Sequence, residues 1–186
     1  MISTGEIKRG MTIEIDGNLY QIQEFQHIKM GRGSAQVRMK LRNIRSGDTI
    51  EKTVQAGEKF SRARLDHRDV QYLYHEGDHY NFMDTSSYEQ LILERDQLGD
   101  AADYLTDGSI VTLNEYQGEA IGVEIPANVV LKITSVEFGV KGDTATGAMK
   151  RATLETGLVV SVPLFVNEGD KIKVDTRTGE YVERAQ

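Results

Sequence analysis

The sequence predicts an all-β protein made of three small β-barrels in series, with little helix. Short runs of alternating apolar and polar residues recur along the 186 residues, and such runs are typical of half-buried strands. The chain has 18 glycines and 2 prolines, which fits many tight turns between short strands. Only Asp96 to Leu105 (DQLGDAADYL) has the apolar spacing of a helix.

Residues 1–64 are expected to form the first barrel. Residues 11–22 (MTIEIDGNLYQI) alternate on both sides of Asp16-Gly17, which is the pattern of a compact hairpin. The next arm becomes irregular at Gln23-Glu24, and this irregularity suggests a β-bulge. With a further strand at 49–54, five short strands over about 60 residues are typical of a small barrel.

The strand between these segments has two unlike faces. Its apolar residues are Val37, Met39 and Leu41, and its cationic residues alternate with them as Arg38, Lys40 and Arg42. Because successive side chains of a strand point to opposite faces, one face is expected to be fully apolar and the other fully cationic.

Two further series of strand-like runs follow, and each is assigned to one barrel. After a polar junction near residues 62–68 the second series fills residues 65–127, and the third fills residues 128–186, with Pro126 near the transition. Glu76–Tyr88 (EGDHYNFMDTSSY) is similar to Glu168–Tyr181 (EGDKIKVDTRTGEY), each with a Glu-Gly-Asp turn, a strand and an Asp-Thr turn. Such repeated units indicate that the second and third barrels are related.

The composition excludes several classes of protein. There is no cysteine, so disulfides and thiolate chemistry are excluded. We find no apolar run of about 18 residues that could span a membrane, and the N-terminus lacks the apolar core of a signal peptide. A cytoplasmic location is therefore expected, with no membrane partner.

The net charge of −7 is unevenly distributed. Residues 1–64 carry 12 Lys/Arg and 7 Asp/Glu, a balance of +5, whereas residues 65–186 carry 10 and 22, a balance of −12. Within the first part, Phe25–Gly47 holds six Lys/Arg and no acidic residue. One basic block in an acidic protein favours contact with a polyanion through that block, and the alternative is a solvated strand face that is basic without a partner.

The segment Gln26–Gln36, QHIKMGRGSAQ, places Arg32 between two glycines at the expected end of a hairpin. Glycine removes side-chain bulk and permits positive φ, so the backbone can approach a partner closely. Arginine can bind phosphate bidentately or stack on a base. Arms of about eight residues would extend the tip by roughly 25 Å. The segment is interpreted as a probe for a crowded anionic site, and the alternative is a turn whose arginine points at solvent.

Enzyme chemistry finds little support in the sequence. His75-Glu76-Gly77-Asp78-His79 matches the zinc-protease pattern H-E-x-x-H, but that chemistry requires both histidines on one helical face. Here Gly77-Asp78 and the strand-like flanks predict a tight turn instead. His27 and His67 have no identifiable partner, no nucleophile elbow is present, and GRGSA lacks the ending of a phosphate loop. We expect no metal, no cofactor and no catalytic residue.

Three stretches in order resemble the bacterial elongation factor P family over essentially the whole chain. The tip HIKMGRGSAQVRMKLRN is similar to the family's hairpin loop, and VDTRTGEYVER is similar to its C-terminal end. The family's C-terminal signature is matched by Lys150-x-Ala152-x4-Gly157-x2-Val160-x-Val162-Pro163-x2-Val166-x2-Gly169.

The resemblance implies an L-shaped, tRNA-like arrangement of an N-terminal KOW/SH3-like barrel and two OB-folds, over residues 1–64, 65–127 and 128–186. It implies a monomeric, non-enzymatic factor that binds the 70S ribosome and its rRNA between the P and E sites, beside P-site peptidyl-tRNA. The factor promotes peptide-bond formation at polyproline stalls by positioning the CCA end of the tRNA, and positioning alone can lower a barrier by several kcal/mol.

The resemblance also implies roles for particular residues. The tip at the CCA end and the peptidyl-transferase centre comprises Lys29, Met30, Gly31, Arg32, Gly33 and Ser34. The contacts to the tRNA or rRNA backbone are assigned to Arg38, Lys40 and Arg42. Gly142, Asp143 and Thr144 match the loop near the E-site codon, and Tyr181 and Arg184 match residues near the anticodon stem-loop. The alternative for that loop is an ordinary turn.

The tip position is often modified in the family. It is lysine in many members and is then β-lysylated, hypusine in eukaryotic and archaeal relatives, and rhamnosylated arginine in one subgroup. This chain has Arg32 there, with Met30 where many lysine-type members have proline and Gly33 where the rhamnosylated subgroup has asparagine. We therefore expect an arginine-tip member whose Arg32 is unmodified.

Two other functions remain open from the sequence. The first is an elongation factor P-like paralogue or a general RNA-binding protein of SH3 and OB type, without a proline-specific effect. The second is a zinc enzyme that uses His75 and His79.

Overall fold

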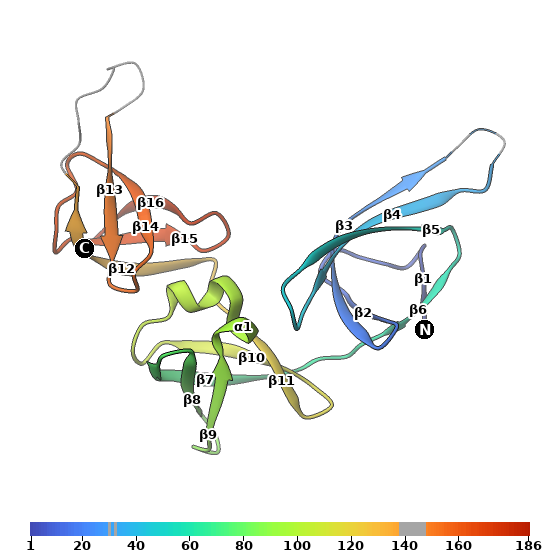
Figure 1. Ribbon diagram of the computed structural model, residues 1–186, viewed down its shortest axis with the longest axis horizontal. Helices are drawn as coiled ribbons and strands as arrows, with labels where there is room; N and C mark the ends of the chain where they lie inside the picture. Colours follow the sequence, from blue (N-terminus) through green and yellow to red (C-terminus); the bar gives the residue numbers. More distant parts are fainter. Residues whose placement is uncertain (30, 32, 138–147) are drawn as a thin grey trace. The chain divides into compact units, whose positions relative to one another are not determined.

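A computed structural model describes residues 1–29, 31, 33–137 and 148–186. These residues form three β-sheets, one short α-helix (α1) and one 3-10 helix (η1) (Figure 1). The predicted all-β class, with three sheets one after another along the chain, is confirmed. In the described part of the chain, no helix is both long and apolar enough to cross a membrane.

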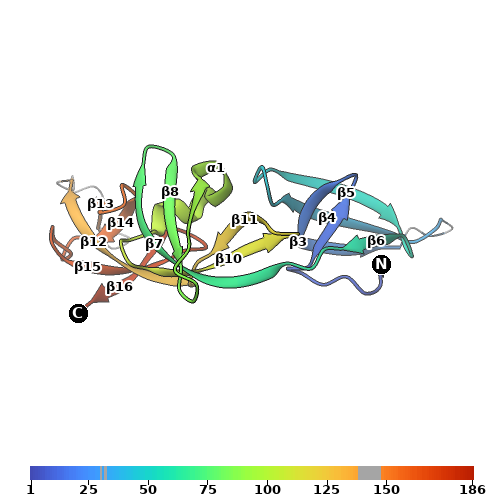
Figure 2. The same ribbon diagram turned by 90° about the horizontal axis from the view of Figure 1, so that it is seen from below.

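The N-terminal sheet has the strand order β1-β6-β2-β3-β4-β5. Its strands are β1 (Ile2–Ser3), β2 (Thr12–Ile15), β3 (Asn18–Ile28), β4 (Gln36–Asn43), β5 (Thr49–Gln55) and β6 (Lys59–Arg62). The predicted hairpin around Asp16-Gly17 joins β2 to β3, and both turn residues have positive φ, 50° and 77°. The β3–β4 hairpin is the longest of this sheet, and its two strands run side by side in Figures 1 and 2.

The middle sheet has the order β11-β10-β7-β8-β9. Its elements are β7 (Asp66–Glu76), β8 (His79–Asp84), β9 (Gln90–Glu94), α1 (Arg95–Leu98), η1 (Gly99–Tyr104), β10 (Ile110–Tyr116) and β11 (Glu119–Glu124). The expected helix Asp96–Leu105 is thus two short helices. The α-helix ends at Leu98 because its C-cap Gly99, where η1 begins, has a φ of 55°, outside the range of a right-handed helix.

The C-terminal sheet has the order β14-β13-β12-β15-β16. Its strands are β12 (Asn128–Val136), β13 (Met149–Leu154), β14 (Val159–Pro163), β15 (Lys171–Asp175) and β16 (Glu180–Ala185). Its core consists of aliphatic side chains from β12, β13, β14 and β15 and from the loop after β14, together with Tyr104 from η1, and Tyr181 of β16 packs against it. Tyr104 is buried there, and this burial raises the pKa of its hydroxyl above the ordinary value.

The two similar segments of the second and third sheets form similar turns, while the relationship between the two barrels stays a prediction. The Glu-Gly-Asp turn at the start of each segment contains a glycine with positive φ. The φ is 58° at Gly77 and 88° at Gly169. After β8, the Asp84 Oδ1 atom accepts a hydrogen bond from the Ser86 backbone N–H at 2.7 Å. After β15, Asp175 Oδ1 accepts the equivalent bond from the N–H of Arg177 at 2.8 Å.

The chain divides into two compact units that do not follow the expected barrel boundaries. Unit 1 comprises Met1–Arg68, Leu93–Gly99 and Leu113–Gly122, and unit 2 comprises Asp69–Ile92, Asp100–Thr112 and Val123–Gln186. The boundaries 1–64, 65–127 and 128–186 and the L-shaped arrangement stay predictions.

Unit 1 contains two clusters of buried apolar side chains. The larger fills the N-terminal sheet and includes Ile13, Ile22 and Phe60. The smaller consists of Leu19, Ala63 and Ile121, with Ile44, Leu65 and Tyr116 packed against it. Two polar contacts lie in the same unit, an ion pair from Arg45 Nη2 to Glu119 Oε2 at 2.9 Å and a hydrogen bond from the Tyr116 hydroxyl to Glu14 Oε2 at 3.3 Å. These contacts join the β10–β11 hairpin to the N-terminal sheet.

Candidate nucleic-acid interface

The β3–β4 hairpin carries the basic block that the sequence singled out. Its two strands pair in antiparallel register from Tyr20 opposite Asn43 to Ile28 opposite Gln36. Eleven residues in β3 correspond to a strand of about 35 Å at the usual rise per residue. Beyond the last pair the described tip residues are exposed, and they are Lys29, Gly31, Gly33 and Ser34. Met30 and Arg32 lie outside the described residues.

The predicted bulge at Gln23-Glu24 is confirmed, and it determines which side chains face outward. Ile22 pairs with Leu41, but the next pair is Glu24 with Lys40, so β3 contains one extra residue. In a regular ladder without the bulge, Gln23 would lie opposite Lys40, and Glu24 would lie opposite Met39 and point to the core side. The bulge therefore keeps a carboxylate out of the core and places it beside a lysine.

The strand β4 has the two faces that alternation predicts. Val37, Met39 and Leu41 are completely buried, whereas their neighbours Arg38, Lys40 and Arg42 are exposed. Burying side chains of this size is worth roughly 1.5–3 kcal/mol each, so the apolar face fixes the orientation of the strand. The cations are outward-facing as a consequence of core packing.

The three cations have unlike neighbours on the adjoining strands. Arg38 pairs with Gln26 of β3 and Thr53 of β5, so both neighbours are uncharged. Lys40 pairs with Glu24 and Glu51, so it has a carboxylate on each side. Side chains directly opposite each other on neighbouring strands lie within about 5.5 Å at Cβ. The positive charge of Lys40 is therefore locally offset, while that of Arg38 is not.

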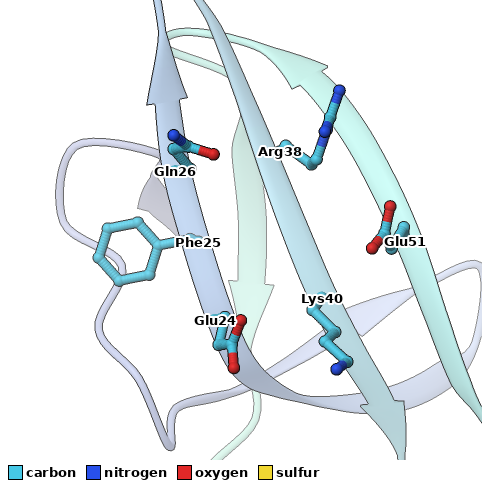
Figure 3. A pocket seen from close by; sticks show the side chains of 6 residues that line it. All are labelled: Glu24, Phe25, Gln26, Arg38, Lys40 and Glu51. Atoms are coloured by element: carbon cyan, nitrogen blue, oxygen red, sulfur yellow. The ribbon is translucent and has the colours of Figure 1, made fainter.

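A shallow depression of about 250 Å³ lies on this outer face. It is lined by Glu24, Phe25, Gln26, Arg38, Lys40 and Glu51 (Figure 3). The Phe25 ring points away from the cations, and its partner across the strands is the buried Met39. It meets His27 edge to face at 5.9 Å. The depression thus offers charged and amide groups, with the aromatic ring on the opposite side of the strand.

Arg42 is held differently from Arg38. A Cβ atom built on Gly99 would lie 3.3 Å from Arg42 Nη2, so the guanidinium packs against the junction of α1 and η1 within unit 1. Gln21 and Thr49 are its partners across the strands. A role for Arg42 in binding RNA stays a prediction, and its position already supplies a structural role.

Tyr181 and Arg184 lie on β16, and a second bulge places them on the same face. Tyr181 pairs with Val174 and Arg184 pairs with Ile172, and the extra residue between them is Val182. Because Val174 and Ile172 are both fully buried, Tyr181 and Arg184 share the core side of the strand. Tyr181 packs on the C-terminal core, and Arg184 Nη1 lies 3.9 Å from Asp170 Oδ2. The predicted loop Gly142, Asp143 and Thr144 lies outside the described residues.

The H-E-x-x-H segment forms the predicted turn. His75 and Glu76 end β7, His79 begins β8, and Glu76 pairs with His79 across the hairpin. His75 stacks on Tyr80 at 4.9 Å and its Nδ1 atom is hydrogen-bonded to the Tyr72 hydroxyl at 2.8 Å. Burial raises the pKa of that hydroxyl to about 12. In the described residues no cluster of three or more His, Asp or Glu side chains is arranged to hold a metal ion.

Three family models match the chain in sequence order. The elongation factor P (EF-P) KOW-like domain matches residues 3–60, the elongation factor P (EF-P) OB domain matches residues 65–123, and the model described as elongation factor P, C-terminal, matches residues 129–184.

Relatives and one solved structure agree with these models. The chain is 54% identical over 185 residues to elongation factor P of Moorella thermoacetica, with complete coverage of both chains. It is 54% identical over 186 residues to elongation factor P of Natranaerobius thermophilus, covering 100% of this chain and 99% of that one. Its fold is similar to eukaryotic translation initiation factor 5A from Methanococcus jannaschii, with a TM-score of 0.52 and 25% identity over 66% of this chain and 92% of that chain. The chain therefore belongs to the elongation factor P family of translation elongation factors.

Proposed function

We propose that this protein binds the ribosome beside P-site peptidyl-tRNA and promotes peptide-bond formation at consecutive prolines. The observation that carries the proposal is the outward cationic face of the β3–β4 hairpin, which leads to the Gly31-Arg32-Gly33 tip in a chain of this family. The hairpin contacts the CCA end of the tRNA and holds it in a productive geometry.

The chemistry of the hairpin suits positioning. Contacts from Lys and Arg to phosphate fix the register of a nucleic acid without reading its sequence, and the exposed Arg38 has uncharged neighbours across both adjoining strands. Holding two reactants in the right orientation removes several kcal/mol of entropic barrier. The protein supplies no nucleophile or general base in this account, and it acts without metal or cofactor.

We assign the other contacts by position. The tip residues Lys29 to Ser34 lie at the peptidyl-transferase centre, and Arg38 contacts the tRNA or rRNA backbone with a smaller contribution from Lys40. Residues 142–144 lie near the E-site codon. Tyr181 and Arg184 share one face of β16 and lie near the anticodon stem-loop. The barrels comprise residues 1–64, 65–127 and 128–186, and the protein acts as a monomer in the cytoplasm.

Arg32 makes this an arginine-tip member, and we propose that the side chain works unmodified. Gly33 follows it where the rhamnosylated subgroup has asparagine, which is the feature that favours an unmodified tip. Mass spectrometry of the intact protein and of its tip peptide, isolated from the native source, tests this directly. The expected result is the unmodified mass, and an added deoxyhexose or other mass on the tip peptide would contradict it.

Translation of matched messages tests the function. Purified protein is added to a reconstituted translation system that lacks the factor, with one message encoding consecutive prolines and a control message without them. The expected result is faster synthesis from the proline message alone. Equal stimulation of both messages, or binding to structured RNA without stimulation, would instead indicate a paralogue or a general RNA-binding protein.

A further inference from the structure

The turn after β8 has the same hydrogen bonds as the turn after β15. The Tyr88 backbone N–H donates to the Asp84 carbonyl at 3.0 Å, and the Gly179 N–H donates to the Asp175 carbonyl at 2.8 Å. Each turn also has an aspartate that accepts a hydrogen bond from the backbone two residues later. Tyr88 and Gly179 therefore occupy the same position in two copies of one structural unit.

The backbone at this position favours glycine. Its φ is 73° at Gly179 and 60° at Tyr88, both in the left-handed region. Glycine adopts that region without a steric cost, whereas a bulky side chain such as tyrosine is strained there. Strained residues persist where the structure or a function retains them.

The surrounding structure explains the glycine but not the tyrosine. A Cβ atom on Gly179 would lie 3.2 Å from the Tyr104 hydroxyl, so packing in the C-terminal sheet leaves little room there. Tyr88 is 71% exposed, and its ring makes no hydrogen bond or ring contact with the residues that the structure describes. Within the described residues, burial of this strained side chain therefore offers the fold little in return.

The charge around Tyr88 identifies the kind of partner. Residues 65–127 carry 2 Lys/Arg and 14 Asp/Glu, and Glu89 follows Tyr88 directly. Asp69 lies beside the turn, because its carbonyl accepts hydrogen bonds from the Thr85 N–H at 3.2 Å and from the Thr85 hydroxyl at 3.1 Å. The negative electrostatic potential of these acidic residues repels phosphate and attracts cations. The face of a tyrosine ring attracts Arg and Lys side chains as well.

We propose that Tyr88, in the turn between β8 and β9, is a docking residue for an arginine or lysine side chain of a ribosomal protein. The proposal rests on the proposed binding to the ribosome and adds a protein contact to the RNA contacts of the β3–β4 hairpin. Here the ring supplies the cation–π face, and Glu89 and Asp69 supply the negative potential around it.

Substitution to glycine separates a binding role from a structural one. We expect Tyr88→Gly to weaken binding to purified 70S ribosomes by roughly two- to fivefold, the loss of one exposed cation–π contact, while the melting temperature stays equal or rises. Tyr88→Phe keeps the ring and should bind like the wild type. Unchanged binding of Tyr88→Gly, or a melting temperature that falls together with binding, would overturn the proposal.

Photocrosslinking identifies the partner class. Benzoylphenylalanine in place of Tyr88, and in a control in place of the exposed Val130 on β12, is irradiated with 70S ribosomes and then treated with ribonuclease or protease. A label from position 88 that survives ribonuclease on an Arg/Lys-rich protein is expected. A label on rRNA or tRNA, or equal labelling from position 130, would overturn the proposal. If the wild-type chain does not bind 70S ribosomes at all, the proposed function itself fails.

Discussion

The hairpins β3–β4 and β15–β16 both carry cations, and among the described residues three cations of the second hairpin have a carboxylate within 4.0 Å while those of the first do not. In β15–β16, Lys173 pairs with Glu183 at 3.0 Å and Arg177 pairs with Asp175 at 2.9 Å, and Arg184 lies 3.9 Å from Asp170. Across the described part of β3–β4, Lys29, Arg38, Lys40 and Arg42 make no ion pair within 4.0 Å.

The difference indicates which cations are available to a ligand. A cation with a carboxylate in contact loses part of its attraction for phosphate, because the pair presents little net charge. A cation without such a partner releases counterions when it meets phosphate, which drives association. This difference favours β3–β4, and Arg38 above Lys40, for the proposed RNA contact. Lys173 and Arg177 of β15–β16 already have carboxylate partners within the fold.

The largest expected effect is on the free energy of unfolding, and it differs between the two faces of β4. Leu41→Ala removes a fully buried side chain and should lower the free energy of unfolding by about 2–5 kcal/mol. Arg38→Ala on the outer face should change it by less than about 0.5 kcal/mol. Chemical denaturation of both variants measures the difference, and equal losses would show that the outer face contributes to folding.

The second largest effect is expected on the affinity for 70S ribosomes. Arg38→Ala should weaken binding to 70S ribosomes by roughly three- to tenfold and reduce the slope of log affinity against log salt by about 1, as expected for one phosphate contact. The matched control is Lys173→Ala, which removes a lysine already paired with Glu183 and should leave both quantities almost unchanged. A larger loss for Lys173→Ala than for Arg38→Ala would reverse the comparison.

A smaller effect, an increase in the affinity for ribosomes, is expected when the carboxylates beside Lys40 are removed. The double substitution Glu24→Gln and Glu51→Gln removes the carboxylates on each side of the lysine while keeping similar side-chain shapes. Binding to 70S ribosomes should tighten by roughly two- to fourfold, because exposed charge pairs are worth less than about 1 kcal/mol. Weaker binding after this change would mean that the two carboxylates contact the ligand themselves.

The smallest effect is a pH dependence in β15–β16. Hydrogen bonds from the Arg177 side chain, and then from its backbone, lower the pKa of Asp175 from 3.8 to about 2. Because the folded-state pKa is the lower one, this pair stabilises the fold above about pH 4 and loses that contribution as the pH falls toward 2. The melting temperatures of the wild type and Arg177→Ala should differ by a small constant amount above pH 4 and converge below it. A difference that grows on acidification would contradict this assignment.

Much of the fold follows from local patterns in the sequence. Alternation in residues 37–42 predicted both faces of β4, and the irregularity at Gln23-Glu24 predicted the bulge, because side-chain period and bulges are local properties of a strand. The Gly77-Asp78 pair likewise predicted the turn that separates His75 from His79. The family resemblance supplied the order of the domains, and the family models confirm a KOW-like domain, then an OB domain, then the C-terminal part of elongation factor P.

What the sequence did not show depends on register and on distant contacts. The carboxylates on both sides of Lys40 come from strands that precede and follow it, so they become neighbours only once the bulge and the hairpin register are known. The contact of Arg42 with Gly99 joins residues 57 positions apart. The helix predicted at 96–105 divided at Gly99 because that glycine takes a positive φ, and propensity alone does not reveal this.

The central claim is that the tip of the β3–β4 hairpin acts on the tRNA end, and Arg32→Ala tests it most directly. The measurement is the rate of synthesis through consecutive prolines in a reconstituted translation system, with binding to 70S ribosomes and the melting temperature measured on the same variant. The expected result is loss of stimulation on the proline message while folding and most of the ribosome binding persist. Stimulation equal to that of the wild type would contradict the account.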